Sequence, residues 1–111
     1  MTQENKDLLL RDLCARLPYG VKVKTNNINI LALGTHTRVG EYVTDVIEPC
    51  KPYLFPLSSM TEEQKTSHNF LKHSAYASPI KLIDFYNKNH FDYRSLIPMG
   101  LAIDATGLNI Y

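Results

Sequence analysis

The sequence predicts an α+β fold: an N-terminal helix, an antiparallel sheet of three to four strands that could curl into a small barrel, and then two or three C-terminal helices. Three observations lead to this prediction. Apolar residues recur at helical spacing near the N-terminus, alternate with polar residues in the following segment, and follow a helix-capping pattern in the second half. A chain of 111 residues can bury one core, so we expect a single domain over residues 1–111.

Residues 2–17 are expected to form the first helix. Thr2 can accept a hydrogen bond as its N-cap, and Pro18 followed by Gly20 ends the helical pattern. Leucines and Cys14 recur at spacings of three and four residues, which gives a wide apolar stripe. We therefore expect the helix to bury one face, with Cys14 in that face and its thiol unreactive.

The chain then changes to strand character. Valines alternate with Lys22 and Lys24, which predicts a half-buried strand with a basic outer face. The asparagine pair at 26–27 indicates a hairpin turn, and residues 28–33, apolar on both faces, are expected to return as a central strand. After a second turn, a third strand over residues 38–47 would complete an antiparallel meander.

Three prolines punctuate residues 49–56. Because proline has no N–H to donate to a ladder, we expect an edge strand or an extended surface connection here. The aromatic and aliphatic side chains of the segment indicate that it packs onto the core. Cys50 lies between two of the prolines and is expected to be the more exposed thiol, beside Lys51, whose charge would lower the thiol pKa.

Two helices are predicted in the second half of the chain. Thr61 and Gln64 have the spacing of a capping box, which predicts a peripheral helix that ends near residue 73. Ser78 followed by a proline predicts the start of a second, better buried helix. Residues 90–97 are expected to form a short further helix or a turn, and residues 101–103 a short strand.

The sequence carries no arrangement of residues that is typical of catalysis. Its five glycines are not clustered, which excludes the known phosphate-binding loops, and the motifs of the common nucleophilic enzymes do not occur. His68 and His73 are five residues apart, whereas two metal ligands on one helical face are four apart. We therefore expect no catalytic residue, no metal ligand, no cofactor and no enzymatic activity.

The charge balance limits the partners. The 12 basic and 11 acidic residues give no global charge that would attract nucleic acid or an anionic membrane. The apolar runs are far too short to span a membrane, and the N-terminus shows no secretory signal. The two cysteines form no close pair, which favours a reducing compartment. The pattern leaves the oligomeric state open.

Two short segments, residues 51–55 and 89–94, concentrate side chains that could bind a partner or ligand. An aromatic ring beside a guanidinium could hold a nucleotide base or a phosphate. An extended, aromatic-rich segment could instead add to a partner's sheet. The candidate binding residues are Lys51, Tyr53, His90, Asp92, Tyr93 and Arg94.

Both segments also have a structural explanation. Phe91 and Tyr93 could anchor the last part of the chain to the core. Asp92 could cap a helix, and Arg94 could pair with a carboxylate. Residues 51–55 could be an edge strand that covers the core. The residue pattern alone leaves these alternatives open.

Three stretches together resemble a known family: residues 6–23, which contain RDLCARLPYGVKV, residues 51–64 (KPYLFPLSSMTEEQ) and residues 89–102 (NHFDYRSLIPMGLA). The resemblance is to small uncharacterised proteins of phages, prophages and mobile elements of gut anaerobic bacteria, and it covers about half of the chain. It assigns no catalytic or binding residue, because the family has no known activity. Phe55 stands where the family pattern has an arginine, which argues against a basic role there. The resemblance implies the cytoplasm of a bacterial host cell.

Three functions are consistent with these observations. The first is a non-catalytic binding protein of phage or mobile-element origin that inhibits or modulates a host protein, such as a defence component. The second is a small-molecule binder that sequesters a nucleotide signal, with Tyr53 or with Tyr93 and Arg94 in its pocket. The third is an accessory protein that binds nucleic acid weakly through Lys22 and Lys24, because so few phosphate contacts give low affinity.

Overall fold

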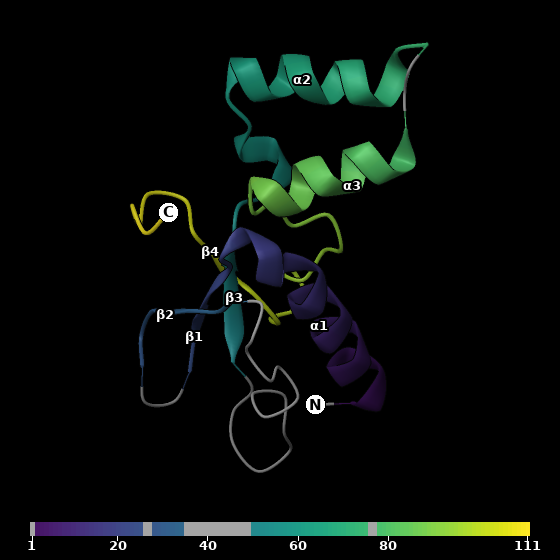
Figure 1. Cartoon of the computed structure of the whole chain (residues 1–111). Helices are drawn as coiled ribbons and strands as arrows, with labels where there is room; N and C mark the ends of the chain where they lie inside the picture. Colours follow the sequence, from purple (N-terminus) through teal and green to yellow (C-terminus); the bar gives the residue numbers. More distant parts are fainter. Residues whose placement is uncertain (1, 26–27, 35–49, 76–77) are drawn as a thin grey trace.

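The computed structural model describes residues 2–25, 28–34, 50–75 and 78–111, and confirms the α+β class (Figure 1). The N-terminal helix, the strands and two C-terminal helices follow one another as predicted, and the short strand expected over residues 101–103 is present slightly later, as Ile103–Asp104, and completes a four-stranded sheet. The elements are α1 (Gln3–Arg16), the short 3-10 helix η1 (Leu17–Tyr19), β1 (Lys22–Lys24), β2 (Leu31–Ala32), β3 (Lys51–Leu54), the 3-10 helix η3 (Leu57–Ser59), α2 (Glu62–His73), α3 (Pro79–Lys88) and β4 (Ile103–Asp104).

The sheet has the order β2-β1-β3-β4 and is mixed rather than wholly antiparallel. β1 is antiparallel to both β2 and β3, with Val23 opposite Leu31 on one side and Pro52 on the other. β4 is parallel to β3, with Tyr53 opposite Ile103. The parallel pair is possible because the chain leaves β3, forms both C-terminal helices and only then returns, and parallel strands need such a long crossover.

Two strand positions differ from the expectation. The strand predicted as central over residues 28–33 is reduced to β2, which lies at the edge of the described sheet and leaves Ile28 and Ile30 exposed. The proline-rich segment, expected at an edge, supplies the interior strand β3. Pro52 is tolerated there because β4 pairs only with the two residues after it, so that ladder begins beyond the proline. The third strand expected over residues 38–47 and the turn at 26–27 lie outside the described residues.

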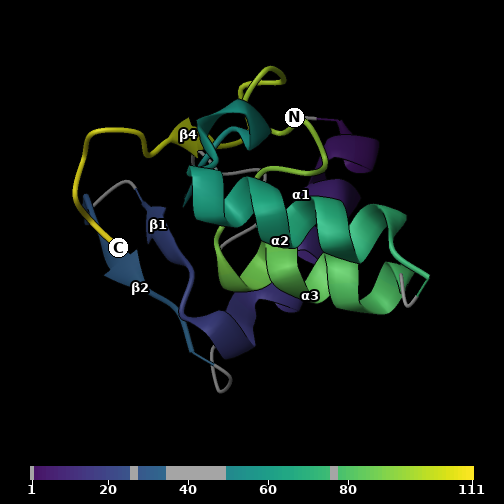
Figure 2. The same cartoon turned by 90° about the horizontal axis from the view of Figure 1, so that it is seen from above.

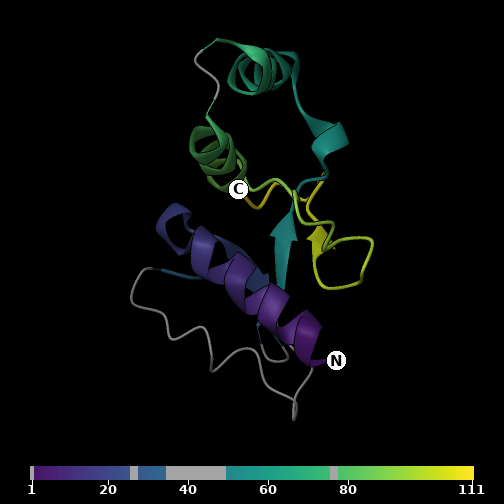
Figure 3. The same ribbon diagram turned by 90° about the vertical axis from the view of Figure 1, so that its right-hand side faces the viewer.

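The core lies between α1 and the sheet. Leu9 and Leu13 of α1 are fully buried and pack with Val21, Val23 and Leu54 of the strands. Leu96 and Leu101, from the chain that leads into β4, belong to the same cluster. α1 therefore covers one face of the sheet, as Figure 3 shows.

The C-terminal helices form two further layers. α3 lies between α1 and α2, and α2 packs mainly against α3, so α2 is the outermost element (Figures 1 and 3). The pair runs side by side in opposite directions (Figure 2). None of the described residues of α2 is buried, whereas Asn87 of α3 is. The α2–α3 hairpin thus forms one end of a molecule with extents of 47 × 27 × 27 Å.

The predicted helix starts are confirmed. Thr2 accepts a hydrogen bond from the N–H of Asn5, and Ser78 accepts one from the N–H of Lys81. At α2, Thr61 Oγ1 accepts from the N–H of Gln64 at 3.2 Å, and the Gln64 side chain accepts from the N–H of Thr61 at 2.9 Å. Both halves of the capping box are therefore present.

Candidate functional site

The two segments singled out in the sequence lie side by side. Phe55 and Phe91 form a parallel bridge that extends the sheet beyond β3. The N–H of Phe55 donates to the carbonyl of His90 at 2.8 Å, and the N–H of Asp92 donates to the carbonyl of Phe55 at 2.9 Å. Backbone pairing therefore brings together candidate residues that are about forty positions apart in the chain.

The residues of the first segment belong to the sheet. Tyr53 is buried, and its hydroxyl donates to the carbonyl of Asn29 at 2.6 Å, which ties β3 to the chain that precedes β2. Lys51 is half-buried in β3 and lies opposite Lys24 in β1. Within residues 51–55, only Lys51 and Phe55 are partly exposed and could contact a partner.

A buried arginine organises the second segment. Arg16, at the end of α1, is fully buried, and its Nε donates to Asp12 Oδ2 at 2.8 Å. Its Nη2 donates to the carbonyl of Phe91 at 2.6 Å, and its guanidinium lies over the ring of Tyr93, 5.2 Å from the centroid. Because a buried guanidinium is costly without a carboxylate, Asp12 and Arg16 fix α1 to the 90–94 segment as a unit.

Tyr93 and Arg94 complete this cluster. Arg94 Nε lies 3.3 Å from Asp12 Oδ1, at ion-pair distance but without hydrogen-bond geometry, and its side chain is 22% exposed. The ring of Tyr93 stacks on Tyr86 of α3 with centroids 5.2 Å apart, and the guanidinium of Arg94 also lies over it. The ring and the cation that could have held a nucleotide base are therefore engaged with groups of the protein itself.

Asp92 has a local structural role. Its two carboxylate oxygens accept hydrogen bonds from the N–H groups of Leu96 at 2.8 Å and Ile97 at 2.9 Å. Residues 90–97 form turns rather than a helix, because His90 and Ser95 both adopt a φ of 60°, which a helix does not allow. Asp92 therefore caps a turn, the role that an aspartate has at the start of a helix.

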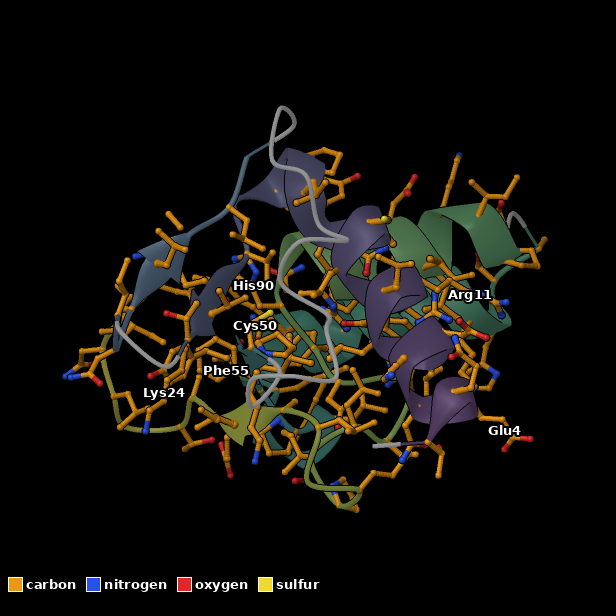
Figure 4. All side chains as sticks on the ribbon, turned by 90° about the horizontal axis from the view of Figure 1, so that it is seen from below. Glu4, Arg11, Lys24, Cys50, Phe55 and His90 are labelled. Atoms are coloured by element: carbon orange, nitrogen blue, oxygen red, sulfur yellow. The ribbon has the colours of Figure 1, made fainter. Side chains whose placement is uncertain are left out.

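His90 lies against the C-terminal residue. Its ring stacks on Tyr111 with centroids 3.7 Å apart. Burial, followed by the positive charges of Arg16 and Lys22, lowers the pKa of His90 to about 4, and burial raises the pKa of Tyr111 to about 12. Both rings are therefore neutral near pH 7. Figure 4 shows His90 among the interior side chains with Cys50 and Phe55, whereas Glu4 extends outward from α1.

Tyr111 also closes one end of the sheet. Its hydroxyl accepts from the N–H of Lys22 at 2.8 Å and donates to the carbonyl of Tyr53 at 2.7 Å, so it bridges β1 and β3. The Lys22 ammonium donates to the carbonyl of Ile110 and lies over the Tyr111 ring. The basic outer face expected on β1 is thus reduced to Lys24, which is exposed.

The environments of the two cysteines are the reverse of those expected. Cys14 is exposed, because the buried face of α1 runs through Leu9, Asp12 and Arg16, and Cys14 lies beside that face. Cys50 is 2% exposed, and burial raises its thiol pKa to about 11. The thiol expected to be the more exposed one, with a pKa lowered by Lys51, is therefore buried and protonated at neutral pH.

The described surface also carries a groove along α2 and α3. A cavity of about 580 Å³ is lined by residues that include Glu63 and Lys88, and a second of about 490 Å³ includes Phe70. Both cavities share Thr66, Ser67 and Phe85, so they form one continuous groove. We call this the α2–α3 groove.

A polar pair next to the groove residue Phe85 joins the same two helices. His68 and Tyr86 are hydrogen-bonded at 2.8 Å, and their rings are 5.6 Å apart. Burial, with the nearby Lys72 and His73, lowers the pKa of His68, and burial raises that of Tyr86. Both shifts favour the neutral forms, so the pair holds α2 to α3 without charge. The groove between the helices is consequently well defined.

The sequence contained only one signal for this groove. Phe70 and Leu71 are the apolar residues of an otherwise polar helix, and Phe70 proves to be 59% exposed. Phe70 lines the groove together with Leu71 and Phe85, so its exposed ring belongs to an apolar patch, which is more informative than a single exposed apolar side chain.

Comparisons with other proteins supply no function. Neither a protein-family model, nor a curated protein, nor a solved structure matches this chain. Within the described ranges, no group of three or more potential ligands is placed to hold a metal ion. None of the helices in the part of the chain that the structure describes is long and apolar enough to cross a membrane.

Proposed function

We propose that this chain is a non-catalytic binding protein and that its partner is a protein held in the α2–α3 groove. The observation that carries this proposal is the exposure of Phe70 beside a groove that runs along the hairpin. Truncation of an aromatic side chain that anchors an interface can remove about 2 kcal/mol or more of binding free energy.

The candidate residues of the 51–55 and 89–94 segments favour this reading over a nucleotide binder. Tyr93 has ring contacts with Tyr86 and two guanidinium groups, and Arg94 is paired with Asp12. A ligand would have to displace these contacts before it could stack. The resemblance to phage and mobile-element proteins supports a host protein as the partner, with inhibition or modulation of that protein as the consequence.

A capture experiment with matched variants tests the proposal. The wild-type chain, Phe70→Ser and Ile80→Ser are each used to capture proteins from a lysate of the bacterial host. Ile80 is 74% exposed and shares a face of α3 with Asn87, away from the groove residue Phe85. We expect one stoichiometric partner with the wild type and Ile80→Ser, and its loss with Phe70→Ser.

Two results would contradict this function. One is a partner that binds the Phe70→Ser variant as well as it binds the wild type. The other is no stoichiometric partner from any relevant host. Because Phe70 is mostly exposed, the serine variant is expected to fold, which a thermal unfolding curve verifies.

A further inference from the structure

We propose that the site which holds the side chain of Tyr111 is a binding site for a tyrosine of a partner polypeptide, and that residues 106–111 occupy it when no partner is bound. The site is separate from the α2–α3 groove, so this inference goes beyond the proposed function. It depends on how the ring is held, on how the hydroxyl is bonded and on how the connecting residues are attached. We call it the Tyr111 site, and its residues are Lys22, Tyr53, Phe55 and His90.

The ring of Tyr111 contacts two other rings and a cation. It stacks on His90 with centroids 3.7 Å apart and an interplanar angle of 12°, and it contacts the tilted ring of Phe55 at 5.8 Å. The ammonium of Lys22 lies over it, 5.5 Å from the centroid. A stacked face, a tilted ring and a cation together select an aromatic side chain over an aliphatic one.

The hydroxyl of Tyr111 is bonded as part of the sheet. Continued by one residue, the register of β1 and β3 brings Lys22 opposite Tyr53. The hydroxyl accepts from the N–H of Lys22 at 2.8 Å and donates to the carbonyl of Tyr53 at 2.7 Å, between two groups that an antiparallel ladder pairs directly. A hydroxyl satisfies both groups because it donates and accepts at once, which the ring of a phenylalanine cannot do. The site therefore selects a phenol over a plain ring.

The site also recognises the backbone before the ring. The ammonium of Lys22 donates to the carbonyl of Ile110, the residue that precedes Tyr111. A free phenol offers no such carbonyl, whereas a tyrosine within a polypeptide always follows one. This contact favours a tyrosine in a peptide over a phenolic small molecule.

The connection between β4 and the Tyr111 site lies at the surface. Residues 106–109 are all exposed, and hydrogen bonds to Asp104 and Ala105 hold two of them. The segment curves outward from β4 and returns beside β1 (Figure 2). Tyr111 is 40% exposed and lies outside the hydrophobic core cluster, so its release leaves that core intact. A short tether holds the ring at an effective concentration of about one millimolar, against which a second tyrosine must compete.

Peptide binding to two full-length proteins tests this inference. One probe is acetyl-Leu-Asn-Ile-Tyr-amide, which copies residues 108–111, and the other is acetyl-Leu-Asn-Ile-Phe-amide, which lacks only the hydroxyl. Calorimetry should show the tyrosine peptide binding Tyr111→Gly at least about tenfold more tightly than the wild type, because this variant has no competing ring. The phenylalanine peptide should bind the same variant about tenfold more weakly, since it leaves the N–H of Lys22 and the carbonyl of Tyr53 without a partner.

A conservative variant keeps the test valid if Tyr111→Gly does not fold. Tyr111→Phe retains the ring and its stack on His90 and removes only the hydroxyl, so it is expected to fold, which a thermal unfolding curve verifies. It should also bind the tyrosine peptide more tightly than the wild type. Equal affinities of the folded variants and the wild type, or no binding to any of them, would overturn the inference. Tighter binding of p-cresol than of the tyrosine peptide would overturn the assignment to a polypeptide.

The two lysines of β1 supply a matched pair of controls in the variant that binds the peptide. Lys22→Met removes the ammonium that contacts the ring and the preceding carbonyl, and should weaken the tyrosine peptide about tenfold. Lys24→Met makes the same change in charge two residues along the strand, where the side chain is exposed, and should have little effect. Equal losses in both variants would show that only the net charge matters and would overturn the assigned role of Lys22.

Two further measurements separate other occupants. Phe70→Ser, in the α2–α3 groove, should leave peptide binding unchanged, because the two sites share no residue. Sedimentation of the chain alone tests a second copy as the source of the tyrosine. A dimer that Tyr111→Gly abolishes would mean that the site receives residues 106–111 of another copy, and would overturn the assignment to a different polypeptide.

Discussion

Asp12 is the residue on which the interior depends most directly. It pairs with Arg16 at 2.8 Å and approaches Arg94 at 3.3 Å, and both Asp12 and Arg16 are fully buried. Removal of the carboxylate charge would leave a guanidinium buried without compensation. Such a change usually costs about 3–5 kcal/mol.

We therefore expect Asp12→Asn to lower the free energy of unfolding by about 3–5 kcal/mol, as measured by urea denaturation. Asp7→Asn, on the exposed side of α1, is the control and should change it by less than about 0.5 kcal/mol. If the first variant fails to fold, Asp12→Leu/Arg16→Met should recover most of the stability, because the pair is then replaced by apolar groups. Equal stability of Asp12→Asn and Asp7→Asn would show that the pair is dispensable.

His90 makes the folded state sensitive to acid. Its pKa is about 4 in the folded protein, below the ordinary value of 6.5, so the unfolded chain binds the extra proton more readily. The contribution is fully present above pH 6.5 and is lost as the pH falls toward 4. Roughly 2 kcal/mol is expected, after allowance for the part of the ring that water reaches.

The measurement is the free energy of unfolding of the wild type and of His90→Asn from pH 7 to pH 4. Asparagine tolerates the positive φ of this position but does not titrate. We expect the variant to be less stable at pH 7 because the stack on Tyr111 is lost, yet to lose less stability on acidification. Parallel pH profiles for the two proteins would show that His90 is not the sensitive group.

The different exposure of the two cysteines predicts two phases of thiol labelling. Cys14 is exposed and Cys50 is buried with a raised pKa, so one thiol should react at once with a disulfide reagent and the second only on unfolding. Cys14→Ser should abolish the fast phase, as thiol titration with mass spectrometry can establish. Rapid labelling of Cys50 in the folded protein would place that thiol at the surface.

At the scale of elements, locally encoded features were predictable and features that depend on distant segments were not. The helix starts at Thr2, Thr61 and Ser78 follow from a few neighbouring residues, and all are present. The interior position of β3 depends on β4, which comes about fifty residues later and pairs with Tyr53 and Leu54, the two residues after Pro52.

The candidate site follows the same rule. The concentration of polar and aromatic side chains at 89–94 was visible in the sequence. The sequence could not show that Arg16, paired with Asp12 of α1, would bind the backbone of this segment. Likewise, the α2–α3 groove arises only when two helices pack. Its residues Glu63 and Lys88 are ordinary charged residues in the sequence.

The capping box stabilises the start of α2, so its loss should affect mainly this helix. Thr61→Ala should remove about 1 kcal/mol of helix stability and accelerate hydrogen exchange of α2 amides by about fivefold. Exchange in α1 should change little, because α2 packs mainly against α3. Ser67→Ala, within the same helix, is the control and should leave α2 exchange unchanged or slower. Uniform acceleration throughout the protein would mean that α2 opens only with the whole fold.

At the scale of the whole molecule, the two ends differ in how they are stabilised. The α1 and sheet end contains the hydrophobic core, the buried Asp12–Arg16 pair and the Tyr111 bridge between β1 and β3. The α2–α3 hairpin lies at the other end (Figure 1), holds no buried residue in α2 and carries the groove. A well-packed base with an exposed helical pair is the arrangement that the proposed binding function requires.

The most direct test of this account is the affinity of the captured host protein for three purified chains, measured by calorimetry. Phe70→Ser should weaken binding at least tenfold relative to the wild type, because it removes the apolar anchor of the α2–α3 groove. Ile80 is more exposed than Phe70 and lies on the same hairpin but outside the groove, so Ile80→Ser should change affinity less than twofold. Equal affinities of all three chains, or a greater loss with Ile80→Ser, would contradict it.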